Sequence, residues 1–401
     1  MATYYPITGG GNWATAGTWN TSANQSTGNA PNAPLATDDV ILDQYGGAVT
    51  VDTNTCVCKT LTANHANANL TISSAKILAV SGNITFITGM TLSGIGNLRC
   101  QAAGTLKSDG LTLPFGLNFN TTGIVKLDGA CVVDGLVTFL NSTSLQYNSS
   151  TSETLTCNGG LTNGNTGSSP NTKIILKGSG KTWTCTSYMY ADIDIDCTSL
   201  TITNIYYRKG VLNYIAGDVS ITGGLYISQS CSLLTDNGST RMTIPVFTLG
   251  IQTLTCTLLS NLTVGDFTNY EGNNLIFTFA GAYNITCDNL GGIHRGGGGN
   301  LIIPSGQTLT ITTSLTLGNT VNYVSLIKAS TPSSSAYLVY SGTVANCKIF
   351  MTTFTDIDAS GSAQGLDNWY GGTLTRCSGI TNRTSADIGG GGSSDVFGII
   401  G

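Results

Sequence analysis

A short unit, apolar-Thr-apolar, recurs along most of this 401-residue chain and constrains its fold more than any other feature. Residues 70–72 (Leu-Thr-Ile), 200–202 (Leu-Thr-Ile) and 309–311 (Leu-Thr-Ile) are examples. Alternation with a period of two is typical of a β-strand with one buried face. Gly, Asn and Ser separate the units, as at residues 81–83 (Ser-Gly-Asn), and these residues favour turns because they tolerate positive φ. No helical periodicity interrupts the alternation, so we expect an all-β chain.

The alternation runs from about residue 40 to about residue 354 without a linker, and its spacing is irregular. This is typical of a single-chain parallel β-solenoid (β-helix), in which each rung is one full circuit of the chain and takes about 25 residues. Aligned Thr and Asn side chains are then expected to stack in ladders between rungs. Stacked jelly-roll or β-sandwich domains are the alternative, because many short strands with frequent turns also fit them.

The two ends of the chain differ from the body at residues 40–354. Residues 1–39 are aromatic and loop-like, and we expect Trp13 and Trp19 to form an N-terminal cap or attachment segment. A solenoid exposes strand edges at its ends, and these edges must be covered. Stacking of these two aromatic side chains on sugar is the alternative. Residues 355–388 are predicted to form closing rungs.

Residues 389–401 are predicted to be a Gly-rich tether followed by an apolar docking peptide. The tether reads Gly-Gly-Gly-Gly-Ser-Ser, a flexible composition. The peptide carries the side chains that we expect to dock into a groove or onto a strand edge of a neighbouring protein. These are Val396, Phe397, Ile399 and Ile400.

Charge and hydropathy exclude several functions. Charged residues make up 9 % of the chain, and the net charge is −5 with 16 Lys and Arg in no basic run. Nucleic-acid binding is therefore not expected, because it requires clustered cations. No apolar run approaches the roughly 20 residues of a spanning helix, so membrane insertion is not expected. Residues 1–6 (Met-Ala-Thr-Tyr-Tyr-Pro) do not read as a secretory signal.

Most of the twelve cysteines occupy an apolar position of an alternating strand, as at residues 155–157 (Leu-Thr-Cys) and 254–256 (Leu-Thr-Cys). This position predicts small, buried, free thiols, and a disulfide framework is the alternative. Cys56 and Cys58 form a C-x-C without a matching second pair, and His65 stands alone, so no zinc site is predicted. No cofactor is expected.

Segments at both ends resemble β-solenoid structural proteins of tailed-bacteriophage virions. The segments are residues 9–13 (Gly-Gly-Gly-Asn-Trp), 17–20 (Gly-Thr-Trp-Asn), 38–42, 49–52, 354–361, 371–374 and 396–398 (Val-Phe-Gly). The resemblance covers about a quarter of the chain. It implies a tail or head fibre, a spike or a decoration protein, assembled in the host cytoplasm into the virion. Such proteins are often homotrimers that contact other virion proteins, and some bind a host-surface glycan.

Two other functions stay open, a polysaccharide-depolymerising tailspike and a secreted bacterial β-helical adhesin on the cell surface. Asp192, Asp194 and Asp196 are the candidate catalytic residues for a glycoside hydrolase or lyase, because alternation places them on one strand face about 7 Å apart. The competing interpretation is an outward acidic strip facing solvent, a cation or a partner. Asp356 and Asp358 form a second pair, which supplies too few oxygens for calcium. Because no Glu, His or Arg cluster lies near Asp192, Asp194 and Asp196 to tune their pKa values, we expect no enzymatic activity.

Overall fold

The computed structural model describes residues 1–140, 144–147, 153–163, 173–250, 253–269, 276–291, 300–318, 325–363, 365–369 and 373–383. These residues contain short β-strands and two 3-10 turns, η1 (Ala16–Thr18) and η2 (Val344–Asn346), and no α-helix. Strands of successive rungs pair in parallel, and about 14 rungs make up a parallel β-solenoid. The predicted fold class is confirmed, and the alternative of stacked antiparallel sandwiches is wrong.

The chain divides into two compact units. Unit 1 comprises Met1–Thr203 and Ile215–Asp218, and unit 2 comprises Asn204–Tyr214 and Val219–Gly401. Strand β27 (Val211–Ile221) has residues in both. The sequence predicted one uninterrupted body and did not indicate this division.

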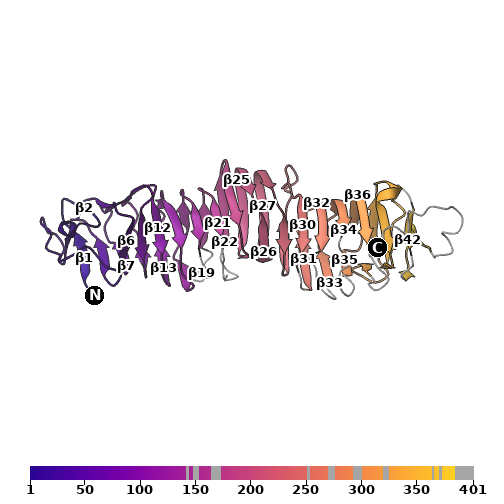
Figure 1. Cartoon of the computed structure of the whole chain (residues 1–401), viewed down its shortest axis with the longest axis horizontal. Coiled ribbons are helices and arrows are strands. Elements are labelled where there is room, and N and C mark those ends of the chain that lie inside the picture. Colours follow the sequence, from indigo (N-terminus) through magenta and orange to yellow (C-terminus); the bar gives the residue numbers. More distant parts are fainter. Residues whose placement is uncertain are drawn as a thin grey trace. The chain divides into compact units, whose positions relative to one another are not determined.

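Unit 1 forms its rungs from three sets of strands, which lie in rows from indigo to magenta in Figure 1. The first set is β1 (Thr3–Pro6), β3 (Trp19–Asn20), β4 (Asp39–Leu42), β7 (Thr60–Ala63), β10 (Ile84–Thr85), β13 (Gly104–Lys107), β16 (Ile124–Leu127) and β19 (Ser144–Tyr147). The second is β2 (Gly11–Asn12), β5 (Val49–Val51), β8 (Asn69–Ile72) and β11 (Thr91–Gly94). The third is β6 (Thr55–Cys58), β9 (Ile77–Val80), β12 (Asn97–Cys100), β14 (Thr112–Leu113), β15 (Gly116–Phe119), β17 (Cys131–Val133), β18 (Val137–Phe139), β20 (Thr154–Cys157), β21 (Leu161–Asn163), β22 (Lys173–Gly178), β23 (Lys181–Cys185) and β25 (Asp192–Ile202). Strand β24 (Met189–Tyr190) also belongs to this unit.

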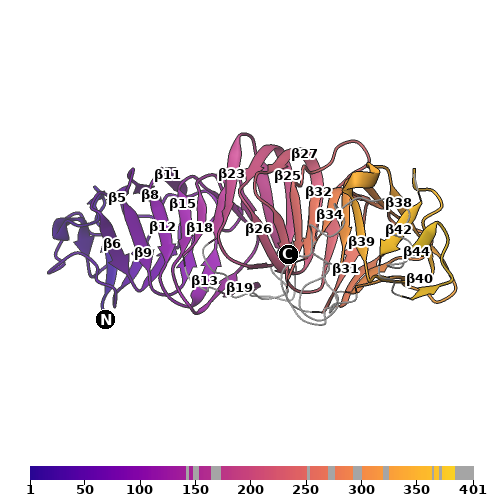
Figure 2. The same cartoon turned by 45° about the vertical axis from the view of Figure 1, so that its right-hand side comes forward.

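Unit 2 forms its rungs from two sets of strands, and Figure 2 shows β32, β34, β39, β42 and β44 of one set in order. That set is β26 (Ile205–Lys209), β28 (Leu225–Ile227), β30 (Val246–Leu249), β32 (Leu262–Asn269), β34 (Ile285–Gly291), β36 (Thr308–Leu317), β38 (Ala336–Tyr340), β39 (Cys347–Phe350), β41 (Ile357–Asp358), β42 (Leu366–Trp369) and β44 (Ile380–Arg383). The other is β29 (Cys231–Leu234), β31 (Leu254–Leu258), β33 (Ile276–Ala280), β35 (Asn300–Ile303), β37 (Leu326–Ala329), β40 (Thr353–Thr355) and β43 (Leu374–Thr375).

The core of unit 1 is built from columns of apolar side chains, one from each rung. Because neighbouring strands lie about 4.8 Å apart in register, each side chain packs on its equivalent in the next rung. One column follows the first set of strands, and all its members are buried: Tyr4, Val40, Leu61, Ile84, Leu106 and Leu127. A rung between these strands therefore takes 21 to 23 residues, slightly fewer than the predicted 25.

In unit 2 the apolar-Thr-apolar units stack directly on one another. Residues 262–264 pair in register with residues 285–287, and these pair with residues 309–311. Their apolar members point into the core, while the central Thr residues lie on the outer face. The predicted burial of Leu155, Cys157, Leu254, Cys256, Ile285 and Cys287 is confirmed.

Polar ladders follow the outer faces and corners of the rungs, as predicted. The Thr71 hydroxyl lies 2.7 Å from the Ser93 hydroxyl of the next rung. At a corner of unit 2 the side-chain oxygen of Asn261 accepts the backbone N–H of Asn284 at 3.0 Å, and the Asn284 side-chain oxygen accepts that of Thr308 at 2.9 Å. The two Asn side chains satisfy backbone N–H groups at positions next to the strand ends.

At the N-terminal end, β1 already pairs in parallel with β4, and β3 pairs antiparallel with the other edge of β1. Trp13 and Trp19 are buried, with ring centroids 4.9 Å apart in an edge-to-face arrangement. The Trp19 indole N–H donates to the Trp13 carbonyl at 2.7 Å. A strand with buried aromatic rings thus lies at the first edge of the unit, and its role as a cap stays a prediction.

Candidate functional sites

The three aspartates of the candidate catalytic strip lie on β25, which pairs in register with β22 of the preceding rung. Asp192 lies opposite Lys173, and Asp196 lies opposite Lys177. Ile193 and Ile195, which alternate with the aspartates, are fully buried. The expected orientation is therefore present, with the isoleucines in the core and the carboxylates on the outer side.

Two of these carboxylates form ion pairs with lysines of the neighbouring rung. Lys173 Nζ lies 2.6 Å from Asp194 Oδ2, and Lys177 Nζ lies 3.2 Å from Asp196 Oδ2. Asp194 is only 8 % exposed, so its charge is partly removed from water and is compensated by the adjacent lysine. The sequence analysis missed both lysines, because their proximity depends on the register between rungs. Catalysis by this strip stays a hypothesis.

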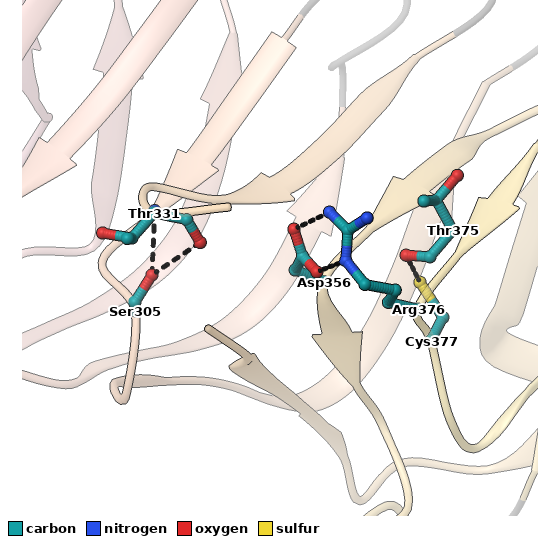
Figure 3. A network of polar contacts seen from close by, with 6 residues as sticks. All are labelled: Ser305, Thr331, Asp356, Thr375, Arg376 and Cys377. Atoms are coloured by element: carbon teal, nitrogen blue, oxygen red, sulfur yellow. Dashed lines mark hydrogen bonds and ion pairs between the residues drawn. The ribbon is translucent and has the colours of Figure 1, made fainter. Parts of the chain in front are cut away.

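A second polar cluster, in the last described rungs of unit 2, is drawn in Figure 3. Phe354 and Thr355 of β40 pair in register with Leu374 and Thr375 of β43. Asp356 directly follows β40 and Arg376 directly follows β43, so the two residues occupy equivalent positions. Both adopt positive φ, at 57° and 51°.

The side chains of Asp356 and Arg376 point toward one another and form a bidentate ion pair (Figure 3). Arg376 Nη2 donates to Asp356 Oδ2 at 2.7 Å, and Arg376 Nε donates to Oδ1. These donors lower the pKa of the Asp356 carboxyl, and the backbone N–H of Ser333 lowers it further. The Asp356 residue is 3 % exposed, so the geometry holds a charged carboxylate in a largely dry corner.

Asp358, which the sequence grouped with Asp356, accepts hydrogen bonds from serine residues and not from an arginine. Its Oδ1 accepts the hydroxyls of Ser360 and Ser378, each at 2.6 Å, and the backbone N–H of Ser360 at 2.9 Å. These donors lower its pKa. In the described part of the chain, no group of three or more His, Cys, Asp or Glu is placed to hold a metal ion.

The same region contains two further local contacts (Figure 3). The backbone N–H of Thr331 donates to the Ser305 hydroxyl at 2.9 Å, which joins two loops of unit 2. The Cys377 thiol donates to the Thr375 carbonyl at 3.2 Å. Neither contact provides a nucleophile-base arrangement.

All twelve cysteines are free thiols, ten of them buried and two partly buried, which confirms the prediction. Burial raises the pKa of Cys100 and Cys131 to about 12, because the thiolate is disfavoured away from water. The Cys56 sulfur lies 3.2 Å from the Thr53 hydroxyl. These thiols act as small apolar side chains in the core.

Two sequence-predicted features lie outside the described residues. One is the Gly-rich tether at residues 389–394, and the other is the docking peptide with Val396, Phe397, Ile399 and Ile400. No helix among the residues with described structure is long and apolar enough to cross a membrane.

Comparison with known proteins does not assign the chain to a family. No protein-family model matches it, and no curated protein or solved structure matches it.

Proposed function

We propose that the chain is a structural component of a tailed-phage virion, namely a fibre, spike or decoration protein. The observation that carries this proposal is that charged candidate residues form ion pairs between rungs. Asp194, Asp196 and Asp356 each form an ion pair with a basic residue of the neighbouring rung. Carboxylates engaged in this way join successive rungs, which is a structural role. The resemblance of both chain ends to phage β-solenoid proteins supplies the biological setting.

The outer faces support the same proposal. They carry stacked Thr, Ser and Asn side chains with few charges, as in the contact Thr71–Ser93. Such a surface is compatible with packing against further protein chains, because little charge has to be desolvated. The partners that we propose are further copies of the chain, as a homotrimer, and other virion proteins. Binding of a host-surface glycan is part of the same proposal.

Immunogold electron microscopy tests the proposal. Antibodies raised against the purified full chain are applied to gradient-purified particles of the phage that encodes it. We expect labelling at one defined position on the particle, and peptides of the chain in the particle's mass spectrum. Labelling of the bacterial envelope with none on the particle would instead indicate the surface adhesin.

A further inference from the structure

Two cysteines of unit 2 lie directly opposite one another on adjacent parallel strands. Cys231 of β29 pairs in register with Cys256 of β31. Both side chains point into the core, and the residues are 6 % and 0 % exposed. The strand spacing of about 4.8 Å falls within the Cα–Cα range of about 4.4–6.8 Å for disulfides.

The other cysteines of neighbouring rungs are placed differently. Cys131 lies opposite Leu155, and Cys157 lies opposite Val133, so these two cysteines are offset by two residues along the strands. Cys58 and Cys100 both lie opposite Val80 and are therefore separated by a whole rung. Among the strand pairs of the described chain, Cys231 and Cys256 are the cysteines that face each other. Cys131 and Cys157, which are buried but offset, can therefore serve as control cysteines in an oxidation experiment.

We propose that Cys231 and Cys256 form a latent disulfide site that links two successive rungs when the protein passes from a reducing to an oxidising medium. The two thiols lose two protons and two electrons, one S–S bond forms, and a two-electron oxidant is reduced. With diamide, an azo compound, the N=N bond takes up both hydrogens and becomes a hydrazine. The inference depends on the register and burial of the two residues and does not rest on the proposed function.

The reaction is expected to be slow in the folded protein. Burial, together with the neighbouring Cys231 thiol, raises the pKa of Cys256, so little thiolate is present. Oxidation then requires transient local opening or a rise in pH. The thiols therefore survive in a reducing medium, and the link forms only after prolonged exposure to oxidant.

The test oxidises the purified full chain with diamide, blocks the remaining thiols in denaturant, and locates the disulfide by peptide mass mapping. We expect one disulfide that joins the peptides containing Cys231 and Cys256, and a mass lower by two hydrogens. The cross-linked protein should unfold at a higher temperature, and a phosphine reductant should reverse both changes.

Matched variants separate this site from general thiol oxidation. Cys131→Ser should leave the new disulfide unchanged, whereas Cys231→Ser and Cys256→Ser should each abolish it. Mapping of the wild-type chain decides the question even if a serine variant fails to fold. A disulfide between Cys131 and Cys157 in folded protein, or none after treatment that oxidises the urea-unfolded chain, would overturn the proposal.

Discussion

Asp356 and Arg376 occupy the same position in two successive rungs and join them through a bidentate ion pair. Both follow a short strand and turn the chain with positive φ. The Asp356 carbonyl accepts the backbone N–H of Ala336 at 3.0 Å, so the corner also holds β38. Because the carboxylate is buried while the arginine is about half exposed, the pair connects the interior to the surface.

Replacing Arg376 by alanine should lower the thermal midpoint clearly. The substitution leaves the buried carboxylate of Asp356 without its strongest donors, and an unpaired buried charge is costly. Arg383→Ala is the matched control, because the Arg383–Asp367 pair is 41 % exposed on both sides and exposed pairs contribute only about 0–1 kcal/mol. Differential scanning calorimetry measures both variants. Equal effects of the two substitutions would contradict a special role of the Asp356 corner.

Acidification should weaken unit 2 through the same residue. The folded-state pKa of Asp356 lies below its ordinary value of 3.8. Its contribution to stability is therefore fully present above about pH 4 and is lost as the pH falls through the lowered pKa. The thermal midpoint of Asp356→Asn should lie below that of the wild type at pH 6, and the difference should shrink at lower pH. A difference independent of pH would exclude this ionisation as the cause.

Phe267→Ala should destabilise unit 2 by about 3–5 kcal/mol, because it removes a fully buried ring from a tightly packed column. The Phe267 ring lies 5.5 Å from that of Phe247 and 5.7 Å from that of Phe279, measured between centroids. Thr286→Ala is the control on the outer face and should cost less than about 1 kcal/mol. Urea denaturation followed by circular dichroism measures both. Similar losses would show that the column is not the core of this unit.

Asp192→Asn and Asp194→Asn should leave the biological function intact. Asp194 forms an ion pair with Lys173 of the neighbouring rung, which is a structural role. Asp194→Asn removes this ion pair and should lower the thermal midpoint only modestly. The assay measures the release of reducing sugar from host polysaccharide by the wild type and both variants. Reproducible release that disappears in the variants would establish a depolymerase and reject the structural role as the main function.

Deletion of residues 389–401 should leave the solenoid folded, with an unchanged thermal midpoint, and should weaken assembly. Val396, Phe397, Ile399 and Ile400 could each contribute roughly 1.5–3 kcal/mol on docking before ordering costs. Ordering of the Gly-rich tether would offset part of this gain, at about 1–2 kcal/mol per residue fixed. Analytical ultracentrifugation and incorporation into particles measure the effect. Unimpaired assembly of the truncated chain would show that this peptide is not an attachment element.

Much of the fold could be predicted because its signals are local. Alternation with a period of two identifies a strand and its buried face within a few residues, so the sequence predicted the burial of Cys157, Cys256 and Cys287 correctly. Gly and Asn mark the corners for the same reason, through the backbone conformations that they tolerate. The solenoid as a whole followed from the repetition of these local units.

The contacts between rungs depended on register, which the sequence alone does not determine when loop lengths vary. The pairs Lys173–Asp194, Asp356–Arg376 and Cys231–Cys256 all join residues about 20 to 25 positions apart. One signal was present: residues 353–356 (Thr-Phe-Thr-Asp) and 373–376 (Thr-Leu-Thr-Arg) follow the same pattern with opposite terminal charges. The sequence by itself determined which side chains face the core. Only the tertiary structure decided which of them meet, because loop lengths vary and the sequence separation of paired residues therefore differs from one rung to the next.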